Sequence, residues 1–272
     1  MKKIYRRILG VVVLGIAFLY WQNNGIVVTK INMENENIPK GFEGYKILQI
    51  SDLHNKTFGK GQKRLVRLVR KAKPDAIFIT GDLIDRNRTD LEAAMELIRE
   101  VVEIAPIYYV SGNHEYSSGV YEDLILLLEI EGVTILENQQ IVLKSKGDQI
   151  DLMGLIDIRA NKNYSFVLNK MTKKCKTGFR ILLSHRPEIF DVYVEKSIDI
   201  AFTGHAHGGQ IHLPFVGGIF SPNQGFFPKY ISGVYIKGDT SMIVSRGLGN
   251  SKFPFRIFNR PELVEVILST GE

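Results

Sequence analysis

Five short apolar segments, each followed at once by polar residues of a kind that binds metals, constrain the fold of this chain most strongly. They cover residues 47–50, 76–80, 107–110, 179–183 and 198–202. A short continuous apolar run is typical of a strand buried on both faces of a sheet. In open parallel sheets, ligands bind at the carboxyl ends of the strands. We therefore expect the polar residues after these segments to lie close together.

The first three segments alternate with amphipathic stretches, which predicts an α/β fold. Residues 62–71, 90–104 and 121–130 place apolar side chains at helical spacing, and the third stretch ends at Gly132. Strand–motif–helix units spaced by roughly 30 residues are typical of repeated βαβ topology.

Beyond residue 133 the pattern changes to short strands, with turns expected at 146–148 and 237–239 and a last strand over 261–268. Two mixed β-sheets that face each other under a cover of helices would accommodate both halves. We predict one catalytic domain over residues 45–272, preceded by a linker over residues 25–44 that includes a first strand at 26–31.

The beginning of the chain predicts a membrane anchor over residues 1–24. An uncharged apolar run over residues 8–21 follows the cations Lys2, Lys3, Arg6 and Arg7. The run is shorter than the about 20 residues of a typical spanning helix, but snorkelling cations extend its effective length. No small-residue cleavage pattern follows the run, so we favour an uncleaved signal anchor over a removed signal peptide or a buried core helix.

The positive-inside rule places the basic end of this anchor in the cytoplasm and the rest of the chain outside. We therefore expect a single-pass protein of the cell membrane.

The formal charge of +6 permits attraction to phosphate esters, anionic lipids or nucleic acid, but it is dispersed, and we expect no specific nucleic-acid partner. A single cysteine, Cys175, excludes an intrachain disulfide and a thiolate metal cluster. The oligomeric state stays open.

The polar residues after the five segments form a candidate set of metal ligands. Five of the six histidines of the chain belong to it, which argues against scattered structural histidines. Imidazole, carboxylate and amide groups without sulfur suit manganese, iron or zinc, and the set is large enough for two ions. Its members are Asp52, His54, Asp82, Asn113, His114, His185, His205 and His207.

These motifs, in their order along the chain, resemble those of the calcineurin-like metallophosphoesterases. They read Asp-x-His, Gly-Asp, Gly-Asn-His-Glu, a lone His and Gly-His-x-His. The Gly-Gly-Gln extension and the anchor make the chain most similar to the bacterial membrane-associated branch of that family. The resemblance covers residues 44–268 and implies a four-layer sandwich and a hydrolase with two metal ions. Ala206, where relatives often carry a hydroxyl residue, is a departure outside the ligand positions.

The resemblance also implies a role for each site residue. Asp82, Asn113 and His114 would be central to catalysis, with His114 facing the substrate and protonating the leaving group. Glu115 is expected to orient His114, and Asp85 either supports a ligand histidine or lies exposed at a helix start. One ion would be held by Asp52, His54, Asp82 and His207, and the other by Asp82, Asn113, His185 and His205.

Two other functions are less consistent with the sequence. A metallo-β-lactamase-type hydrolase needs a His-x-His-x-Asp-His block, which the chain lacks. A binding module derived from the family would have lost ligands, and none is missing here.

The substrate is not specified by the motifs. We favour a phosphodiester over a monoester or the pyrophosphate of a nucleotide-linked lipid precursor. The substrate would be a phospholipid or a lipid- or wall-linked phosphate at the outer leaflet, or else a soluble ester on which the anchored enzyme acts. Arg246 and Arg256 would either bind substrate phosphate or form salt bridges. An aromatic excess in the tail would be either core or a lipid-facing lip; it comprises Phe215, Phe220, Phe226 and Phe227.

Overall fold

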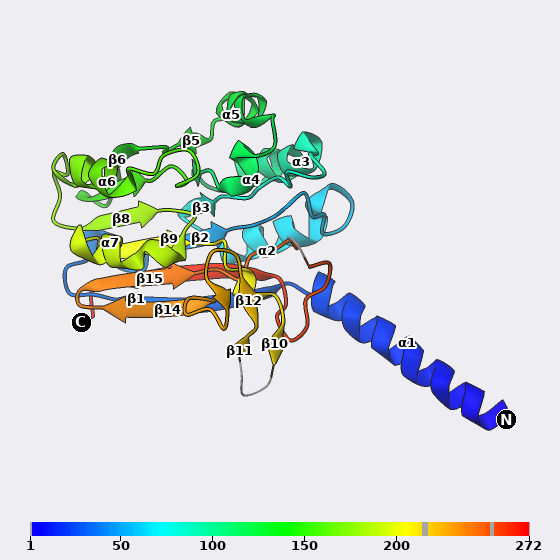
Figure 1. Ribbon diagram of the computed structural model, residues 1–272. Helices are drawn as coiled ribbons and strands as arrows, with labels where there is room; N and C mark the ends of the chain where they lie inside the picture. Colours follow the sequence, from blue (N-terminus) through cyan, green and yellow to red (C-terminus); the bar gives the residue numbers. More distant parts are fainter. Residues whose placement is uncertain (1, 214–216, 251–252, 272) are drawn as a thin grey trace.

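Two six-stranded sheets face each other in the computed structural model, which describes residues 2–213, 217–250 and 253–271 (Figure 1). Both sheets are mixed, as predicted. The first has the order β1 (Val27–Glu34), β16 (Glu262–Ser269), β2 (Lys46–Ile50), β3 (Ala76–Thr80), β4 (Ile107–Val110) and β5 (Thr134–Ile135). The second has the order β14 (Gly233–Lys237), β15 (Thr240–Val244), β9 (Ile200–Thr203), β8 (Arg180–Leu183), β7 (Asp148–Gly154) and β6 (Gln139–Ser145).

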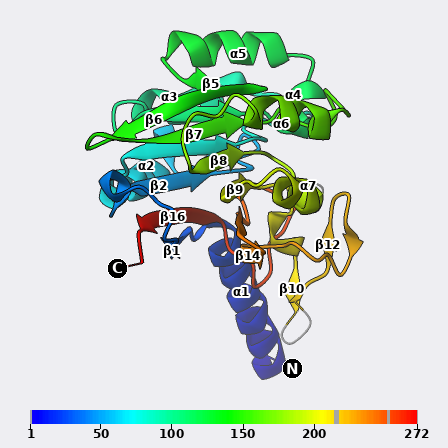
Figure 2. The same ribbon diagram turned by 90° about the vertical axis from the view of Figure 1, so that its left-hand side faces the viewer.

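Helices cover the outer face of each sheet (Figure 2). The first sheet carries α2 (Lys63–Ala72), α3 (Leu91–Val101) and α5 (Tyr121–Ile130). The second carries α6 (Tyr164–Thr172) and α7 (Phe190–Glu195). The result is the predicted four-layer α/β/β/α sandwich. For most helices and strands, the observed bounds differ from the expected ones by only a few residues.

Three hydrophobic clusters hold the four layers together. Along β3, Ile77 and Ile79 pack under the helices, whereas Ala76 and Phe78 face the second sheet. A strand buried on both faces needs apolar side chains at successive positions, because these point alternately to opposite sides. The rings of Phe78 and Phe202 meet edge to face between the sheets, with centroids 5.1 Å apart.

The N-terminal helix α1 (Lys2–Asn24) extends away from the sandwich (Figure 1). By its length and composition this helix could cross a bilayer. Its apolar part is not buried in the protein. It leads directly into β1, which runs three residues beyond the expected first strand and pairs in parallel with β16 from Val27 to Glu34. Residues 27–34 of the expected linker therefore belong to the first sheet.

The remaining elements are small hairpins and short helices outside the two large sheets. Two small hairpins, β10 (His212–Leu213) with β11 (Gly217–Gly218) and β12 (Phe220–Ser221) with β13 (Gly225–Phe226), lie between β9 and β14 in the sequence. In both views β10 and β11 project on the side of the molecule from which α1 leaves (Figures 1 and 2). The remaining short helices are α4 (Asn113–Tyr116), η1 (Lys40–Phe42), η2 (Lys60–Gln62), η3 (Pro187–Ile189) and η4 (His207–Gly209).

Candidate metal centre

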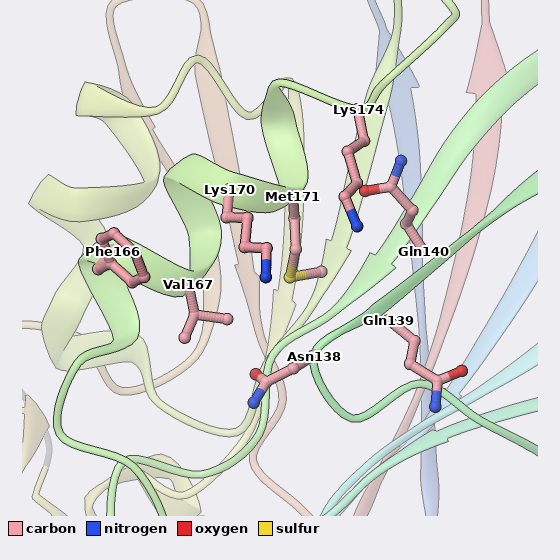
Figure 3. A pocket seen from close by; sticks show the side chains of 8 residues that line it. All are labelled: Asn138, Gln139, Gln140, Phe166, Val167, Lys170, Met171 and Lys174. Atoms are coloured by element: carbon pink, nitrogen blue, oxygen red, sulfur yellow. The ribbon is translucent and has the colours of Figure 1, made fainter.

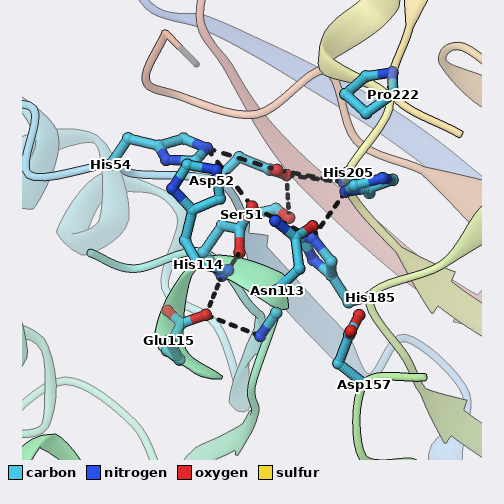
Figure 4. A network of polar contacts seen from close by, with 12 residues as sticks. Ser51, Asp52, His54, Asn113, His114, Glu115, Asp157, His185, His205 and Pro222 are labelled. Carbon is cyan, nitrogen blue, oxygen red and sulfur yellow. Dashed lines mark hydrogen bonds and ion pairs between the residues drawn. The ribbon is translucent and has the colours of Figure 1, made fainter. Parts of the chain in front are cut away.

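The eight candidate ligand and catalytic residues lie where the carboxyl ends of strands from both sheets meet (Figure 4). Each follows a strand of the sequence pattern, so the register of the strands brings them to one edge. Asp52 and His54 follow β2, Asp82 follows β3, Asn113 and His114 begin α4, His185 follows β8, and His205 and His207 follow β9.

Four buried side chains form the first ligand cluster. Ligand atoms of Asp52, His54, Asp82 and His207 all lie within 4.8 Å of one another. His207 Nε2 is 3.3 Å from an Asp52 oxygen, and His54 Nε2 is 3.6 Å from Asp82 Oδ2. Two imidazoles and two carboxylates in this spacing suit a divalent transition-metal ion.

A second cluster shares Asp82 with the first. It joins Asp82 to His185 and His205, again with ligand atoms within 4.8 Å of one another. Asn113 lines the same cavity as Asp82 and His205, and its Oδ1 is buried without a hydrogen-bond partner among the described residues. A buried amide oxygen without a partner is costly, and a metal ion at this position would satisfy it.

The protonation states of His54, His205 and His207 favour metal binding. Burial lowers the pKa of His54 to about 3 and holds the pKa values of His205 and His207 well below the ordinary histidine range. Neutral rings offer a lone pair to a metal ion. Burial would raise the pKa of Asp82, but the adjacent imidazoles outweigh it and keep the pKa of this carboxyl well below its usual value, so it is a carboxylate.

His185 illustrates how the main chain selects the ligand atom. Its Nδ1 lies 2.7 Å from the carbonyl oxygen of Thr80, so Nδ1–H donates to that carbonyl and Nε2 faces Asp82 at 3.3 Å. Burial alone would lower the pKa of His185, but Asp82 raises it to about 10. The proton on His185 Nε2 thus lies between Asp82 and His205, and a bound metal ion would replace this proton.

The backbone at the site is strained. Five of the seven expected ligands have a positive φ, namely Asp52, His54, Asp82, His205 and His207. Such a conformation costs a non-glycine residue energy and persists only where surrounding contacts impose it. The glycines of the motifs permit this packing, because a Cβ at Gly112 would lie 2.2 Å from Asp82 Oδ1 and 2.7 Å from its backbone nitrogen.

Glu115 supports the Asp82 loop rather than the His114 ring that the sequence suggested. Its carboxylate accepts hydrogen bonds from the backbone N–H groups of Asp82 at 3.0 Å, Leu83 at 2.6 Å and Gly112 at 2.8 Å. These bonds fix the turn after β3 against the start of α4.

Asp85 is buried and faces two histidines, so it is not the exposed helix-start residue of the alternative interpretation. Its Oδ2 lies 3.7 Å from His54 Nδ1 and 3.8 Å from His114 Nδ1. The Arg86 backbone N–H donates to His114 Nδ1 at 3.2 Å. Burial lowers the pKa of His114, so the neutral ring carries its proton on Nε2.

A polar cavity of about 80 Å³ opens beside the ligands, with His114 and Asn113 in its lining. Three arginines that the sequence analysis did not select also line it, Arg86, Arg159 and Arg186. Arg186 is fully buried and pairs with Asp157 through two contacts of 2.6 and 3.0 Å, while its Nη1 lies 2.7 Å from His205 Nε2.

Two signals in the sequence could have identified this ion pair. Arg186 directly follows the ligand His185, and Asp157 follows the end of β7 as the other acidic site residues follow their strands.

The two arginines suggested as phosphate contacts have other partners. Arg246 pairs with Glu262 at 2.8 Å, in line with the salt-bridge alternative. Arg256 is buried and donates to the carbonyl oxygens of Arg246 and Gly249. Neither of the two lines the cavity beside the ligands.

The aromatic residues of the tail fall into two groups. Phe220 is half-buried and contacts the Phe226 ring, whereas Phe226 and Phe227 are 72% and 69% exposed. Phe215 lies outside the described residues. The turn between β12 and β13 contributes Pro222 and Asn223 to the cavity, so one hairpin reaches both the site and this exposed aromatic surface.

A larger cavity of about 430 Å³ lies away from the metal centre, between α6 and the start of β6 (Figure 3). Asn138, Met171 and Lys170 are among its lining residues, and none of the candidate ligands is. The chemistry of the chain is therefore concentrated in the smaller, more polar cavity.

Comparisons with known proteins point to one family. A family model described as "Calcineurin-like phosphoesterase" matches residues 45–209. An uncharacterized metallophosphoesterase of Bacillus subtilis, YkuE, is 31% identical over 260 residues, which cover 92% of this chain and 88% of YkuE. The Escherichia coli phosphodiesterase YaeI is 28% identical over 224 residues, 80% of each chain. The structure of TT1561 of Thermus thermophilus is similar in fold, with a TM-score of 0.50 at 11% identity over 75% of this chain and 90% of that one.

Proposed function

The chain belongs to the calcineurin-like phosphoesterase family, and from this premise we propose that it hydrolyses phosphodiester or related phosphate-ester bonds with two divalent metal ions. The observation that carries the proposal is the pair of buried ligand clusters that share Asp82. The orphaned Oδ1 of Asn113 supports a second ion beside the first. Manganese, iron and zinc suit these ligands.

Bound metal ions would supply a water of lowered pKa and polarise the phosphoryl oxygens. Asp52, His54, Asp82 and His207 would hold one ion, and Asp82, Asn113, His185 and His205 the other. Asp82 fits the shared position because its Oδ2 faces His54 Nε2 at 3.6 Å and His185 Nε2 at 3.3 Å, while its Oδ1 accepts from the His114 backbone N–H. Asn113 adds an oxygen ligand without adding negative charge.

His114 would act on the substrate rather than on the metals. Its Nε2 carries a proton, and the negative charge of a bound phosphate ester raises the pKa of a nearby imidazole. We infer that His114 stabilises charge on the phosphoryl group and donates a proton to the leaving oxygen. Asp85, whose Oδ2 lies 3.7 Å from His54 Nδ1, would orient the His54 ring, whereas His114 Nδ1 is held by the Arg86 N–H.

We place this activity at the outer face of a membrane. Residues 1–24 would anchor the chain with the basic end in the cytoplasm, and residues 45–272 would form the catalytic domain outside. The exposed Phe226 and Phe227 support a substrate at the bilayer surface, such as a lipid- or wall-linked phosphate, because their hairpin also lines the cavity.

The experiment that tests the proposal compares the wild-type protein with Asp82→Asn after loading with manganese, zinc or iron. Elemental analysis should find about two ions per wild-type chain, together with activity on bis(p-nitrophenyl) phosphate. Asp82→Asn should lower the metal content and abolish hydrolysis while leaving the circular dichroism unchanged. Asp191→Asn, an exposed aspartate paired with Lys237, is the control and should behave as wild type. Two ions and full activity in Asp82→Asn would exclude the shared-ligand mechanism.

A further inference from the structure

The last turn of α1 is hydrogen-bonded to the catalytic domain through Asn23. Its Oδ1 accepts from the backbone N–H of Arg256 at 2.9 Å and from Asn250 Nδ2 at 3.2 Å. Its Nδ2 donates to the Arg256 carbonyl at 3.3 Å, and the Lys56 ammonium donates to the Asn23 carbonyl. One helix residue therefore contacts two separate loops of the domain.

Ring contacts and burial also hold this end of the helix against the domain. Phe18 meets Phe258 with ring centroids 5.5 Å apart, and the Arg260 guanidinium lies 4.5 Å from the centre of the Trp21 ring. Gln22 is buried, unlike the rest of the helix. This end of the anchor is thus packed as part of the domain.

The loop that Asn23 contacts packs directly on the backbone of two metal ligands. The Gly249 N–H donates to the Asp52 carbonyl at 2.6 Å, and Leu248 N–H donates to the Ser51 carbonyl at 3.0 Å. A Cβ at Gly249 would lie 2.2 Å from the Leu53 carbonyl oxygen and 2.9 Å from His54 Cβ. Because main chain lies against main chain here, a shift of the loop moves the Asp52–His54 turn.

Arg256 extends the network to a third ligand. Its side chain is buried and donates to carbonyls of its own loop and, at 3.4 Å, to the Asn259 carbonyl. Asn259 Nδ2 in turn donates to the carbonyl of His207 at 2.7 Å and to that of Gln210 at 3.0 Å. The network therefore ends on the backbone of residues from the first ligand cluster.

The ligands that this network reaches are strained, with φ values of 51° at Asp52, 48° at His54 and 49° at His207. Contacts that hold a strained backbone in place preorganise the site and raise its affinity for a ligand. We propose that Asn23 is a positioning residue for the first metal site, so that metal affinity there depends on the anchor helix. This inference rests on the proposed metal-binding function.

The test measures Mn²⁺ affinity of the full-length protein in detergent by competition with a chelating dye, without recourse to activity. Asn23→Ala should weaken one of the two sites about tenfold, since it loses hydrogen bonds at the helix end. Asn23→Asp keeps the acceptor for Arg256 and Asn250 but sets a carboxylate oxygen against the Leu19 and Arg256 carbonyl oxygens, so it should weaken the same site to a smaller extent than Asn23→Ala. Asn24→Ala is the matched control, because the only hydrogen bond that its amide donates among the described residues goes to the Tyr20 carbonyl of its own helix.

The result separates this inference from the proposed function. Equal weakening of both sites, an unchanged affinity in Asn23→Ala, or the same loss in Asn24→Ala would overturn the positioning role. A wild-type protein that binds no metal would overturn the proposed function and this inference together. Thermal melting of the metal-free proteins shows whether Asn23→Ala is folded; a loss of affinity with unchanged melting supports the proposal.

Discussion

At the scale of single residues, we propose that some groups of the cavity hold metal and others face the substrate. His114 belongs to the second kind: its Nδ1 is occupied by the Arg86 N–H, and its ring is in the cavity lining. We expect His114→Ala to retain its metal and to lose about 10²–10⁴-fold in rate, as for a lost proton donor. The loss should be smaller for aryl esters, whose leaving groups need little protonation. Loss of metal from this variant would show that His114 is a ligand instead.

Arg86 is the residue of the cavity lining that we expect to contact a substrate phosphate. Its guanidinium has no acidic partner among the described residues, in contrast to Arg186 with Asp157. Arg86→Gln should raise KM about tenfold, the effect of one charged hydrogen bond, without changing metal content. Arg88→Gln, an exposed arginine two residues further that does not line this cavity, is the control in the same steady-state assay. Equal effects of the two changes would rule out a specific contact by Arg86.

At the scale of elements, the two sheets are joined by large side chains that reach across the interface. Phe78 of β3 is fully buried and contacts Phe202 of β9. Phe78→Ala should lower the free energy of unfolding by about 3–5 kcal/mol through lost burial and a cavity between the sheets. Phe166→Ala, at a side chain 70% exposed on α6, should change it by no more than about 0.5 kcal/mol. Denaturant unfolding measures the change in the free energy of unfolding for both variants. Similar changes in the two variants would contradict this account of the interface.

Local sequence patterns predicted much of this architecture. Strand β3 appears as an apolar run because Ile77 and Phe78 are buried on opposite faces. Helix α5 and strand β4 have the boundaries that the periodicity and the flanking motifs predict. The ligand motifs were visible because Asp52 and Asp82 directly follow apolar strands.

Features that depend on distant pairing were not predictable in the same way. Glu115 binds backbone N–H groups in the turn that begins 33 residues earlier, at Asp82, and no spacing rule indicates such a contact. The parallel pairing of β1 with β16 joins Val27 to Glu262, and each strand alone has no preferred partner. The ion pair of Arg186 with Asp157 was missed for the same reason, although both residues lie next to strand ends.

At the scale of the whole molecule, we propose that the exposed Phe226 and Phe227, whose hairpin also lines the cavity, bring the site to a bilayer surface. Changing Phe226 and Phe227 together to serine should lower the rate on a phosphodiester embedded in vesicles about tenfold, because two apolar side chains no longer enter the bilayer. The rate on a soluble aryl diester should be unchanged. Phe166→Ser, at the equally exposed side chain on α6, should alter neither rate. Equal loss on both substrates would indicate a structural role for the two phenylalanines.

The position of β16 between β1 and β2 has a consequence for biosynthesis. Of the strands in the first sheet, β1 is translated first and β16 last, so β1 and β2 are complete while the place between them is still empty. Until residues 262–269 leave the ribosome, both neighbours expose an unpaired edge, and unpaired edges promote aggregation. Folding of the first sheet is therefore expected to finish only after nearly the whole chain has been made.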